Sequence, residues 1–486
     1  MQLRYHSTNN RDERATFRKA LMNGLASNYG LYMLWKDEIP ILRAPLIRSM
    51  RTMSYAEIAL QVLFPYLKES IPKNKLKVIL SDCYPKDHFP TNVIRVTGNT
   101  YLLMLTAGPT YSFKDYAARF FARMLNHFLT VSKRLKVVLV ATSGDTGGAV
   151  ADALYGLDNV SNVILFPKST ISDRQRRQMT TLGGNIYAIE VNGDFDVCQS
   201  LVKRLLADRD LALRLFCDPD RFTSANSISI GRLLPQAVYP FFAYSRIADY
   251  DEPLIVSVPS GNFGDLMGTI VAKNMGLPIS KIVCAVNENR TFYEFLQTGN
   301  YTVKPSKKSP SSAMNVSNPS NFSRLIELYG GHIYDKRDNE GNIIQVGIID
   351  LQPDIVAMKN DIYSQSISDI DHYKTIKQVY DTFGIILEPH GAVAWKALEQ
   401  YLNGKHNMLS IAYETADPGK FPEDIRKAIG LRPNVPERIA RQANKRERIF
   451  SIKDTPETKE DGSTVSSEAQ YKSIVSLLEQ FFKKPK

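Results

Sequence analysis

From Leu135 onward, short runs of β-branched and aliphatic residues alternate with segments of helical periodicity. This alternation is typical of repeated βαβ units, in which each helix returns the chain to the same end of a parallel sheet. Because the runs are apolar throughout, we expect helices to cover both faces of one such sheet or of two. The pattern predicts strands at Lys136–Thr142, Asn162–Phe166, Asn185–Val191, Leu254–Pro259, Lys281–Val286 and Met408–Tyr413.

The two ends of the chain lack this alternation. Helical patterns such as "MSYAEIALQVLFPYL" predict a mainly helical N-terminal region. Ser, Asn and Pro are frequent between Asn287 and Ile376, which indicates loops and short helices near a site. Beyond Arg441 the chain becomes charged and polar, so we expect a peripheral tail there.

The composition argues against several classes of protein. No apolar run reaches the ~18 residues that span a bilayer, and the start of the chain lacks the apolar segment of a secretory signal. We therefore expect a cytoplasmic protein without a membrane partner. The four cysteines are scattered, so neither a metal site nor a disulfide framework is expected. The net charge of +11 is spread along the chain, which favours a small anionic ligand over a nucleic acid.

One lysine has an unusual setting, in the segment "TAGPTYSFKDYAARF". Ser112 and Asp115 have the spacing of a capping box, which predicts a helix with Ser112 as its N-cap. Lys114 then lies in the first turn, where the helix dipole and partial burial both disfavour its ammonium form. A lysine with a lowered pKa is suited to form a Schiff base with a carbonyl group. Spacing alone leaves open the alternative of a solvated lysine that happens to follow a cap.

Two glycine-rich turns stand between an expected strand and an expected helix, in "ATSGDTGGAVADAL" and "VPSGNFGDLMGTIVAKNMGL". The N–H groups of such a turn suit a carboxylate or a phosphate at a helix N-terminus, and in the first turn the Ser143 and Thr146 hydroxyls add to them. Either turn alone is also explained by a tight connection that needs glycine. Together with Lys114, they indicate a site for an anionic ligand and a cofactor phosphate.

Polar residues also follow later strands, at the sheet edge where α/β proteins bind ligands. "LEPHGAVAW" contains His390, for which a packing or capping role is the preferred interpretation. "YETADPGKF" contains the neutral hydroxyl of Thr415, and "NSISIGRLLPQ" contains Arg232. Arg232 either binds a substrate or pairs with a structural carboxylate, and the sequence leaves both interpretations open.

These segments together resemble the longer-chain branch of the threonine synthase family, whose pyridoxal-phosphate fold type is shared with the tryptophan synthase β subunit. The resemblance covers roughly residues 1–425 and rests on "GPTYSFKD", "TSGDTG", "QMTTLGGNI", "GDFDVCQSLVK", "GRLLPQ", "VPSGNFGD", "EPHGAVA" and "TADPGKF". It implies an α/β fold of two open, mostly parallel sheets flanked by helices, with an N-terminal helical region. The implied divisions are a helical region 1–95, a large cofactor-binding subdomain 96–118 with 226–430, a small subdomain 119–225, and a peripheral tail 431–486.

The resemblance also implies roles for single residues. Lys114 matches the catalytic lysine that holds pyridoxal phosphate through a Schiff base and then transfers protons. Asp145 matches a residue beside the ring 3'-oxygen, and Thr415 matches a hydroxyl beside the pyridine nitrogen. The loop that grips the cofactor phosphate matches Gly261, Asn262, Phe263, Gly264 and Asp265. The expected substrate-binding residues are Ser143, Thr146, Asn226, Ser227 and Arg232, with "SNPSNFSR" as a further candidate for the substrate phosphate.

Members of this family convert O-phospho-L-homoserine and water to L-threonine and phosphate, and we expect that reaction from a monomer or a homodimer. Two departures from the family pattern bear on the pocket for the leaving phosphate. "SISI" replaces the usual "SINW", and "NGLASNYGLY" lacks the usual Asp-Gly. Two alternatives therefore stay open: a phospholyase that acts on another phosphorylated amino acid, and a non-catalytic, basic binding protein that keeps the fold.

Overall fold

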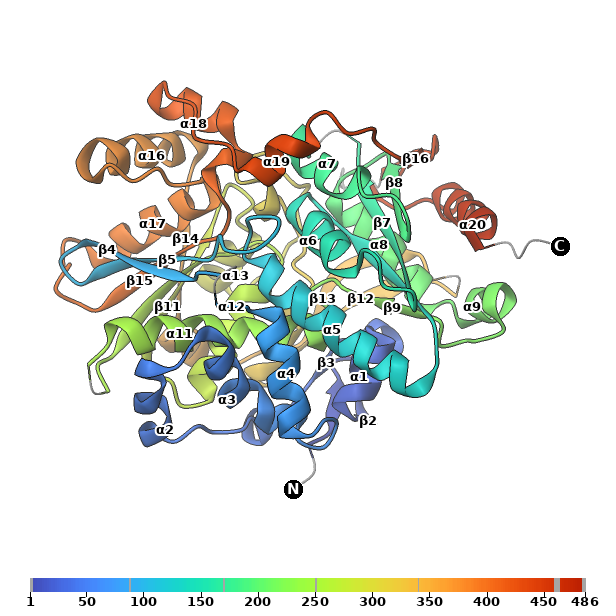
Figure 1. Cartoon of the computed structure of the whole chain (residues 1–486), viewed down its shortest axis with the longest axis horizontal. Helices are drawn as coiled ribbons and strands as arrows, with labels where there is room; N and C mark the ends of the chain where they lie inside the picture. Colours follow the sequence, from blue (N-terminus) through green and yellow to red (C-terminus); the bar gives the residue numbers. More distant parts are fainter. Residues whose placement is uncertain are drawn as a thin grey trace.

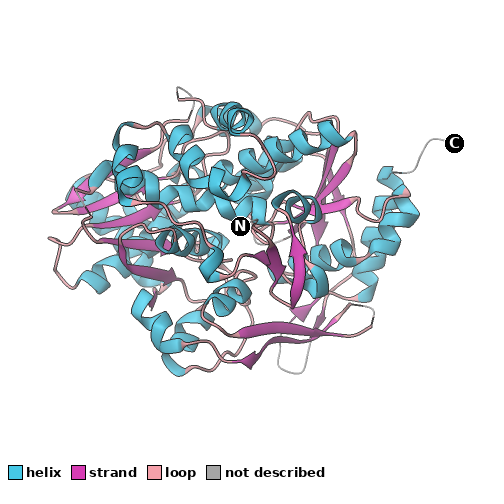
Figure 2. Ribbon diagram, turned by 90° about the horizontal axis from the view of Figure 1, so that it is seen from below, coloured by secondary structure: helices cyan, strands magenta, loops and turns pink. Residues whose placement is uncertain are grey.

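The computed structural model describes residues 3–86, 89–168, 171–249, 251–339, 341–458 and 464–482. Two sheets of mostly parallel strands lie side by side, and helices pack around both (Figure 1). A view turned by 90° shows the strands as separate groups with helices between and around them (Figure 2). The predicted α/β class, with two open sheets flanked by helices, is confirmed.

The larger sheet has six strands in the order β14-β11-β10-β15-β5-β4. All neighbouring pairs are parallel except β4 and β5, which form an antiparallel edge. The sequence prediction covers β10, β11 and β15 and omits the other three, of which β4 is largely exposed. The strands are β4 (Asn92–Thr97), β5 (Thr100–Met104), β10 (Leu254–Pro259), β11 (Ile279–Val286), β14 (Ile362–Ser366) and β15 (Ser410–Glu414).

Both faces of this sheet are covered because successive residues of its buried strands point to opposite sides. On β10, Ile255 packs into the cluster formed with α17, whereas Val256 packs into the cluster formed with α12. The helices around this sheet are α10 (Ile230–Leu233), α11 (Val238–Ile247), α12 (Gly264–Asn274), α13 (Thr291–Thr298), α14 (Phe322–Leu328), α15 (Ile355–Asp361), α16 (Asp369–Phe383), α17 (Pro389–Leu402) and α18 (Pro422–Ile429). A hairpin of β12 (His332–Arg337) and β13 (Ile343–Leu351) lies beside α14.

The smaller sheet has five parallel strands in the order β16-β8-β7-β6-β9. The predicted strands at β6, β7 and β8 are confirmed. The five strands are β6 (Lys136–Ala141), β7 (Val160–Pro167), β8 (Ile186–Val191), β9 (Phe222–Ser224) and β16 (Ile449–Ser451). The helices that pack around them are α5 (Lys114–Ser132), α6 (Asp145–Leu154), α7 (Asp173–Thr180), α8 (Phe195–Ala207) and α9 (Arg209–Phe216).

The prediction of a peripheral tail at 431–486 is wrong. After α19 (Glu437–Gln442), β16 joins the edge of the smaller sheet beside β8. The last helix, α20 (Glu468–Phe482), then buries Tyr471, Ile474 and Leu478 in the same core cluster as α8. These three side chains recur at helical spacing and form an apolar stripe that the polar stretch before them conceals. Residues 459–463 and 483–486 of the predicted tail lie outside the described residues.

The N-terminal region braces the helix that begins at Lys114. Its α4 packs against α5, and its α3 packs against α11. The region also contains an antiparallel sheet in the order β2-β1-β3, which the helical patterns do not predict. Its elements are β1 (Tyr5–Ser7), β2 (Asn10–Ala15), β3 (Tyr32–Met33), α1 (Phe17–Asn23), α2 (Ala44–Ser49), α3 (Tyr55–Leu67) and α4 (Lys73–Cys83). Among the described residues, no helix has both the length and the apolar character needed to cross a membrane.

Candidate active site

One cavity gathers nearly all the residues that the sequence analysis selects. It lies where β10 and β15 end and where α5, α6 and α12 begin, which is the edge at which open α/β sheets bind ligands. Of the predicted site residues, Phe263 and the segment "SNPSNFSR" are absent from its lining. The predicted residues that line it are Lys114, Ser143, Asp145, Thr146, Asn226, Ser227, Arg232, Gly261, Asn262, Gly264, Asp265 and Thr415.

Lys114 lies in the first turn of α5, as predicted, but the helix begins at Lys114 itself and the predicted capping box is absent. Phe113 already has helical backbone angles and stands at the N-cap position, and no side chain caps the helix. The Asp115 carboxylate instead accepts hydrogen bonds from the backbone N–H of Thr110, at 2.8 Å, and from its hydroxyl, at 2.7 Å. Asp115 therefore ties the helix start to the glycine–proline turn before it, and this tie fixes where Lys114 emerges.

The amine of Lys114 is enclosed by aromatic and charged groups. Its Nζ lies 4.3 Å from the centre of the Phe113 ring and 4.0 Å from Asp145 Oδ2. Burial lowers the pKa of Lys114, and this outweighs the opposing effect of the Asp145 and Asp265 carboxylates. The predicted direction of the shift is therefore correct, but burial is its main cause rather than the position of the lysine in the helix.

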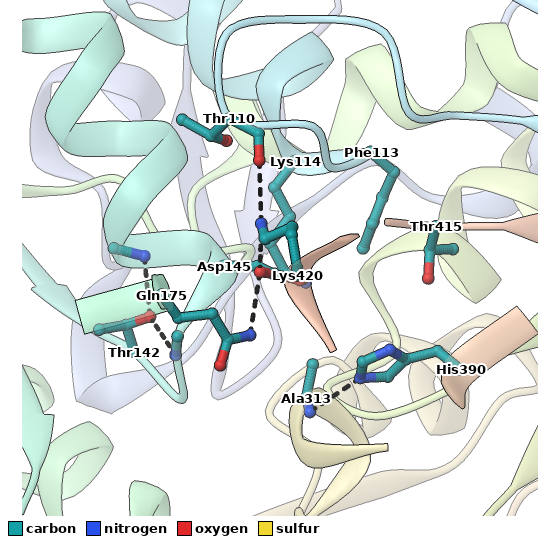
Figure 3. A network of polar contacts seen from close by, with 12 residues as sticks. Thr110, Phe113, Lys114, Thr142, Asp145, Gln175, Ala313, His390, Thr415 and Lys420 are labelled. Carbon is teal, nitrogen blue, oxygen red and sulfur yellow. Dashed lines mark hydrogen bonds and ion pairs between the residues drawn. The ribbon is translucent and has the colours of Figure 1, made fainter. Parts of the chain in front are cut away.

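Asp145 has a second lysine partner that the sequence analysis does not select. The Nζ of Lys420, which is fully buried, lies 2.6 Å from Asp145 Oδ1, and Gln175 Nε2 donates to the same oxygen at 3.0 Å (Figure 3). Burial alone would raise the pKa of Asp145, but the two lysines hold it well below its usual range. Lys420 belongs to the quoted segment "TADPGKF", so its position was visible in the sequence although its partner was not.

The turn before α6 is held in shape by Thr142. Thr142 Oγ1 accepts the N–H groups of Gly144 and Gly147, at 2.9 and 2.8 Å. Gly144 has a φ of 136°, and a Cβ at this position would lie 2.6 Å from the Gln175 side chain. Glycine is therefore required here for both backbone and space, and Ser143 lines the cavity from the top of the turn.

The second turn also requires glycine, because a Cβ on Gly261 would lie 2.3 Å from the carbonyl oxygen of Ala313. Asn262 holds the turn in place: its Nδ2 donates to Gln199 on α8, at 3.1 Å, and its Oδ1 accepts the N–H of Ser320. Phe263 is a correction to the predicted site. Its backbone is left-handed, and its side chain is buried away from the cavity.

Phe263 packs against other aromatic rings, with its ring centre 5.1 Å from that of Phe292. Only its backbone remains available to a ligand at the start of α12. Asp265, in the first turn of α12, lines the cavity, and burial raises the pKa of its carboxyl to about 6.

A buried polar network lies below Thr415. Its hydroxyl donates to Glu388 Oε1 at 2.9 Å, and Glu388 Oε2 lies 2.5 Å from His390 Nδ1. His390 Nε2 accepts the N–H of Ala313 at 3.0 Å, so the ring proton is on Nδ1 and is donated to Glu388. His390 lines the cavity as well as packing beneath it. Glu388 caps α17 and is the residue that orients both Thr415 and His390, although the sequence analysis does not select it.

The predicted substrate-binding residues differ in what their side chains still have free. Both ends of the Asn226 amide bond to the backbone of Ala141, so Asn226 joins the end of β6 to the segment that follows β9. Ser227 Oγ accepts from Asn321 at 2.9 Å. Arg232 Nη1 donates to the carbonyl of Ala225, whereas its buried Nε has no hydrogen-bond partner among the described residues.

The arginine of "SNPSNFSR" does not serve the cavity. Arg324 is fully buried, and its guanidinium donates to the carbonyls of Tyr32, Ser227 and Ile228 and to Asn321 Oδ1. Its donors are used to hold the N-terminal region against the loop, so the Arg324 guanidinium is not free to bind a substrate phosphate, and a role for the rest of the segment stays a prediction.

Comparisons with known proteins agree with this geometry. The families described as threonine synthase N terminus, pyridoxal-phosphate dependent enzyme, and threonine synthase C-terminal match residues 4–84, 87–346 and 391–461. The threonine synthase of Escherichia coli is 33% identical over 443 residues, which cover 91% of this chain and 95% of that relative. The chain belongs to the threonine synthase family. The threonine synthase of Haemophilus influenzae is 34% identical, with coverage of 88% and 92%.

Solved threonine synthase structures are similar along nearly the whole chain. The E. coli structure has a TM-score of 0.84 and 31% identity, with coverage of 99% of this chain and 100% of that one. A threonine synthase from Brucella melitensis with bound pyridoxal phosphate has a TM-score of 0.83 and 29% identity, with the same coverage. Pyridoxal phosphate is accordingly the cofactor of this chain.

The cavity fits that cofactor. It offers the Lys114 amine, the α12 N-terminus, and at Gly261 a close approach to the backbone that any side chain would block. The departures from the family pattern lie elsewhere, since neither Ser229 nor Ile230 of "SISI" lines the cavity. The Ser27–Tyr29 turn of "NGLASNYGLY" borders a separate groove near α1. The departures therefore give no reason to expect a substrate different from that of the family.

Proposed function

We propose that this cavity converts O-phospho-L-homoserine and water to L-threonine and phosphate, with Lys114 as its catalytic residue. The observation that carries the proposal is the meeting of a largely buried lysine amine with two glycine turns, each at the start of a helix. A helix N-terminus favours an anion. The site has three anionic groups to hold: the cofactor phosphate, the substrate carboxylate and the substrate phosphate.

The cofactor has a defined place in this proposal. Bound through the Lys114 amine, pyridoxal phosphate supplies an electron sink for the carbon atoms next to the substrate amino group. Backbone N–H groups of the 261–265 loop would hold its phosphate, and the Thr415 hydroxyl would face its ring nitrogen. Because Thr415 donates its proton to Glu388, its oxygen can accept a hydrogen bond from the ring nitrogen only when that nitrogen carries a proton.

The substrate would be held by groups on the smaller sheet and on α10. Ser143 and Thr146, at the start of α6, would bind the substrate carboxylate through their hydroxyls and the adjacent N–H groups. Arg232 would bind the phosphate that leaves, because its buried Nε has no partner within the described residues and lies in a group that lines the cavity.

Lys114 would move the protons. The conversion requires removal of a proton at Cα and then at Cβ, loss of the γ-phosphate with a proton delivered to Cγ, and addition of water at Cβ with a proton returned to Cα. A single amine beside both carbon atoms can serve as the base for both steps if it is uncharged when it acts. Burial favours the uncharged form of Lys114.

The remaining assignments of the proposal concern the whole chain. We place it in the cytoplasm as a monomer or homodimer, and the unpaired cysteines Cys83, Cys198, Cys217 and Cys284 suit a reducing compartment. We assign 96–118 with 226–430 to a large subdomain and 119–225 to a small one. β16 and α20 join the small subdomain because they pack on its sheet.

The test is to incubate the cofactor-loaded protein with O-phospho-L-homoserine and to measure phosphate and threonine in the same sample. Equal amounts of both are expected. Phosphate with an oxo acid and no threonine would favour the phospholyase alternative. Failure to release phosphate from any phosphorylated amino acid would favour the non-catalytic alternative.

A further inference from the structure

Two lysines share one carboxylate in the cavity, and they share it unequally. Asp145 Oδ1 lies 2.6 Å from Lys420 Nζ, whereas Asp145 Oδ2 lies 4.0 Å from Lys114 Nζ. Lys420 therefore makes the direct ion pair, and Lys114 stays beyond hydrogen-bond distance of the same carboxylate. Lys420 has no exposed surface, so it has no solvent to turn to if Asp145 is removed.

Lys420 is also tied to the start of the Lys114 helix. Its Nζ donates to the carbonyl of Thr110 at 2.9 Å, and Thr110 is the residue that Asp115 holds in place before α5 (Figure 3). One buried ammonium thus contacts both the carboxylate that faces Lys114 and the turn that positions it. A distant positive charge could neutralise Asp145 without either of these direct contacts, so the contacts indicate that Lys420 also fixes the positions of the groups around Lys114.

The charged groups around the Lys114 amine are nearly balanced. His390 on α17 faces the carboxylates of Asp145 and Asp265. The groups that face Lys114 are Asp145 on α6, Asp265 on α12, Arg232 on α10, and Lys420 on the short 3-10 helix η6 (Pro418–Lys420). Removing the charge of Lys420 would leave Asp145 with Lys114 as its nearest cation, and a lysine in a buried ion pair is held protonated.

We propose that Lys420 is a positioning residue that takes the charge of Asp145 and thereby keeps the Lys114 amine uncharged and nucleophilic. The proposal rests on the proposed function only in giving that amine a task. A carboxylate is present beside the amine, and a second lysine prevents it from converting the amine to an ammonium ion.

The test measures the protonation of Lys114 in the full chain without added cofactor. Trace labelling with acetic anhydride over a range of pH, followed by peptide mass spectrometry, gives the pH midpoint at which Lys114 becomes reactive. Lys420→Met should raise this midpoint by about one pH unit, which is a roughly tenfold loss of labelling below it. The exposed Lys405→Met is the control and should leave the midpoint unchanged.

The sign of the effect separates this role from a merely structural one. Asp145→Asn should lower the midpoint, because Lys114 then faces Lys420 without the carboxylate between them. The double variant Asp145→Asn with Lys420→Met removes both charges and should return the midpoint close to that of the wild type. An unchanged midpoint in Lys420→Met, or a shift of the same sign in both single variants, would overturn the proposal.

A second comparison covers the case in which Lys420→Met fails to fold. The double variant leaves neither charge of that pair, so it is compared with Asp145→Asn alone, and its midpoint should be the higher of the two. Equal midpoints would overturn the proposal. Because labelling needs neither cofactor nor substrate, these results stand whether or not the protein forms threonine, and the activity assay fails or succeeds separately.

Discussion

Replacing Glu388 by glutamine is expected to destabilise the protein strongly, although the substitution keeps the size of the side chain. Oε2 accepts the backbone N–H of His390 at 2.9 Å and the Nδ1–H of the same residue at 2.5 Å. Oε1 accepts the N–H of Gly391 and the hydroxyl of Thr415, each at 2.9 Å. A glutamine has one acceptor oxygen, so in either orientation at least one buried backbone N–H loses its partner.

The magnitude follows from that count. An unpaired buried donor costs about 1–3 kcal/mol, and the bonds that remain lose the strength that a charged acceptor gives them. We expect Glu388→Gln to lower the free energy of unfolding by about 3 kcal/mol, measured by urea unfolding followed by circular dichroism. The exposed Glu423→Gln, in the first turn of α18, should change it by less than about 0.5 kcal/mol.

A neighbouring glutamate gives a sharper control. Glu414 is equally buried, and burial together with the nearby Glu388 carboxylate raises its pKa well above the usual range. Burial therefore favours its neutral form, and Glu414→Gln should cost less than about 1 kcal/mol. If the two variants lose equal stability, or if Glu388→Gln matches Glu423→Gln, the assignment of Glu388 as the charged centre of the network is wrong.

Three further predictions follow from single contacts. Gly261→Ala should weaken pyridoxal phosphate binding at least about tenfold in a fluorescence titration, since its Cβ would lie 2.3 Å from the Ala313 oxygen; unchanged affinity would contradict the role of this turn. Leu478→Ala should lower the free energy of unfolding by about 2–5 kcal/mol, against a smaller loss for the partly buried Leu477→Ala, and equal losses would contradict the docking of α20. Burial raises the pKa of Asp115 to about 6, so its proton is bound more tightly in the folded state, and the stability this gives is lost as pH rises from about 4 to about 6. Wild type should lose about 2 kcal/mol relative to Asp115→Asn over that range, and a constant difference would contradict the raised pKa.

Much of the fold and site could be predicted from the sequence because their signals are local. The continuous apolar runs mark the buried strands β6, β7, β8, β10, β11 and β15. Glycines at or just before the first residue mark the N-termini of α6 and α12. Lys114 stands between a turn and an apolar stripe, so its place at the start of a helix could be inferred before any contact was known.

The parts that could not be predicted depend on partners far away in the chain. Lys420 and Asp145 are 275 positions apart in the sequence (420 − 145), and no local pattern joins them. The predicted capping box is absent for a related reason. The Asp115 carboxylate accepts its hydrogen bonds from Thr110 rather than from the N-cap residue, and the spacing of the sequence does not distinguish these two partners. The charged and polar stretch after Arg441 indicates a tail, and the apolar stripe of α20 finds its partner only in the folded chain, in the core cluster that it shares with α8.

The central claim is that Lys114, rather than the buried Lys420 that pairs with Asp145, holds the cofactor. The most direct measurement is borohydride reduction of the cofactor-loaded protein followed by peptide mass spectrometry. The pyridoxyl group should be found on the peptide that contains Lys114 and should be absent from Lys114→Ala. A pyridoxyl group on Lys420, or on neither lysine, would contradict the account.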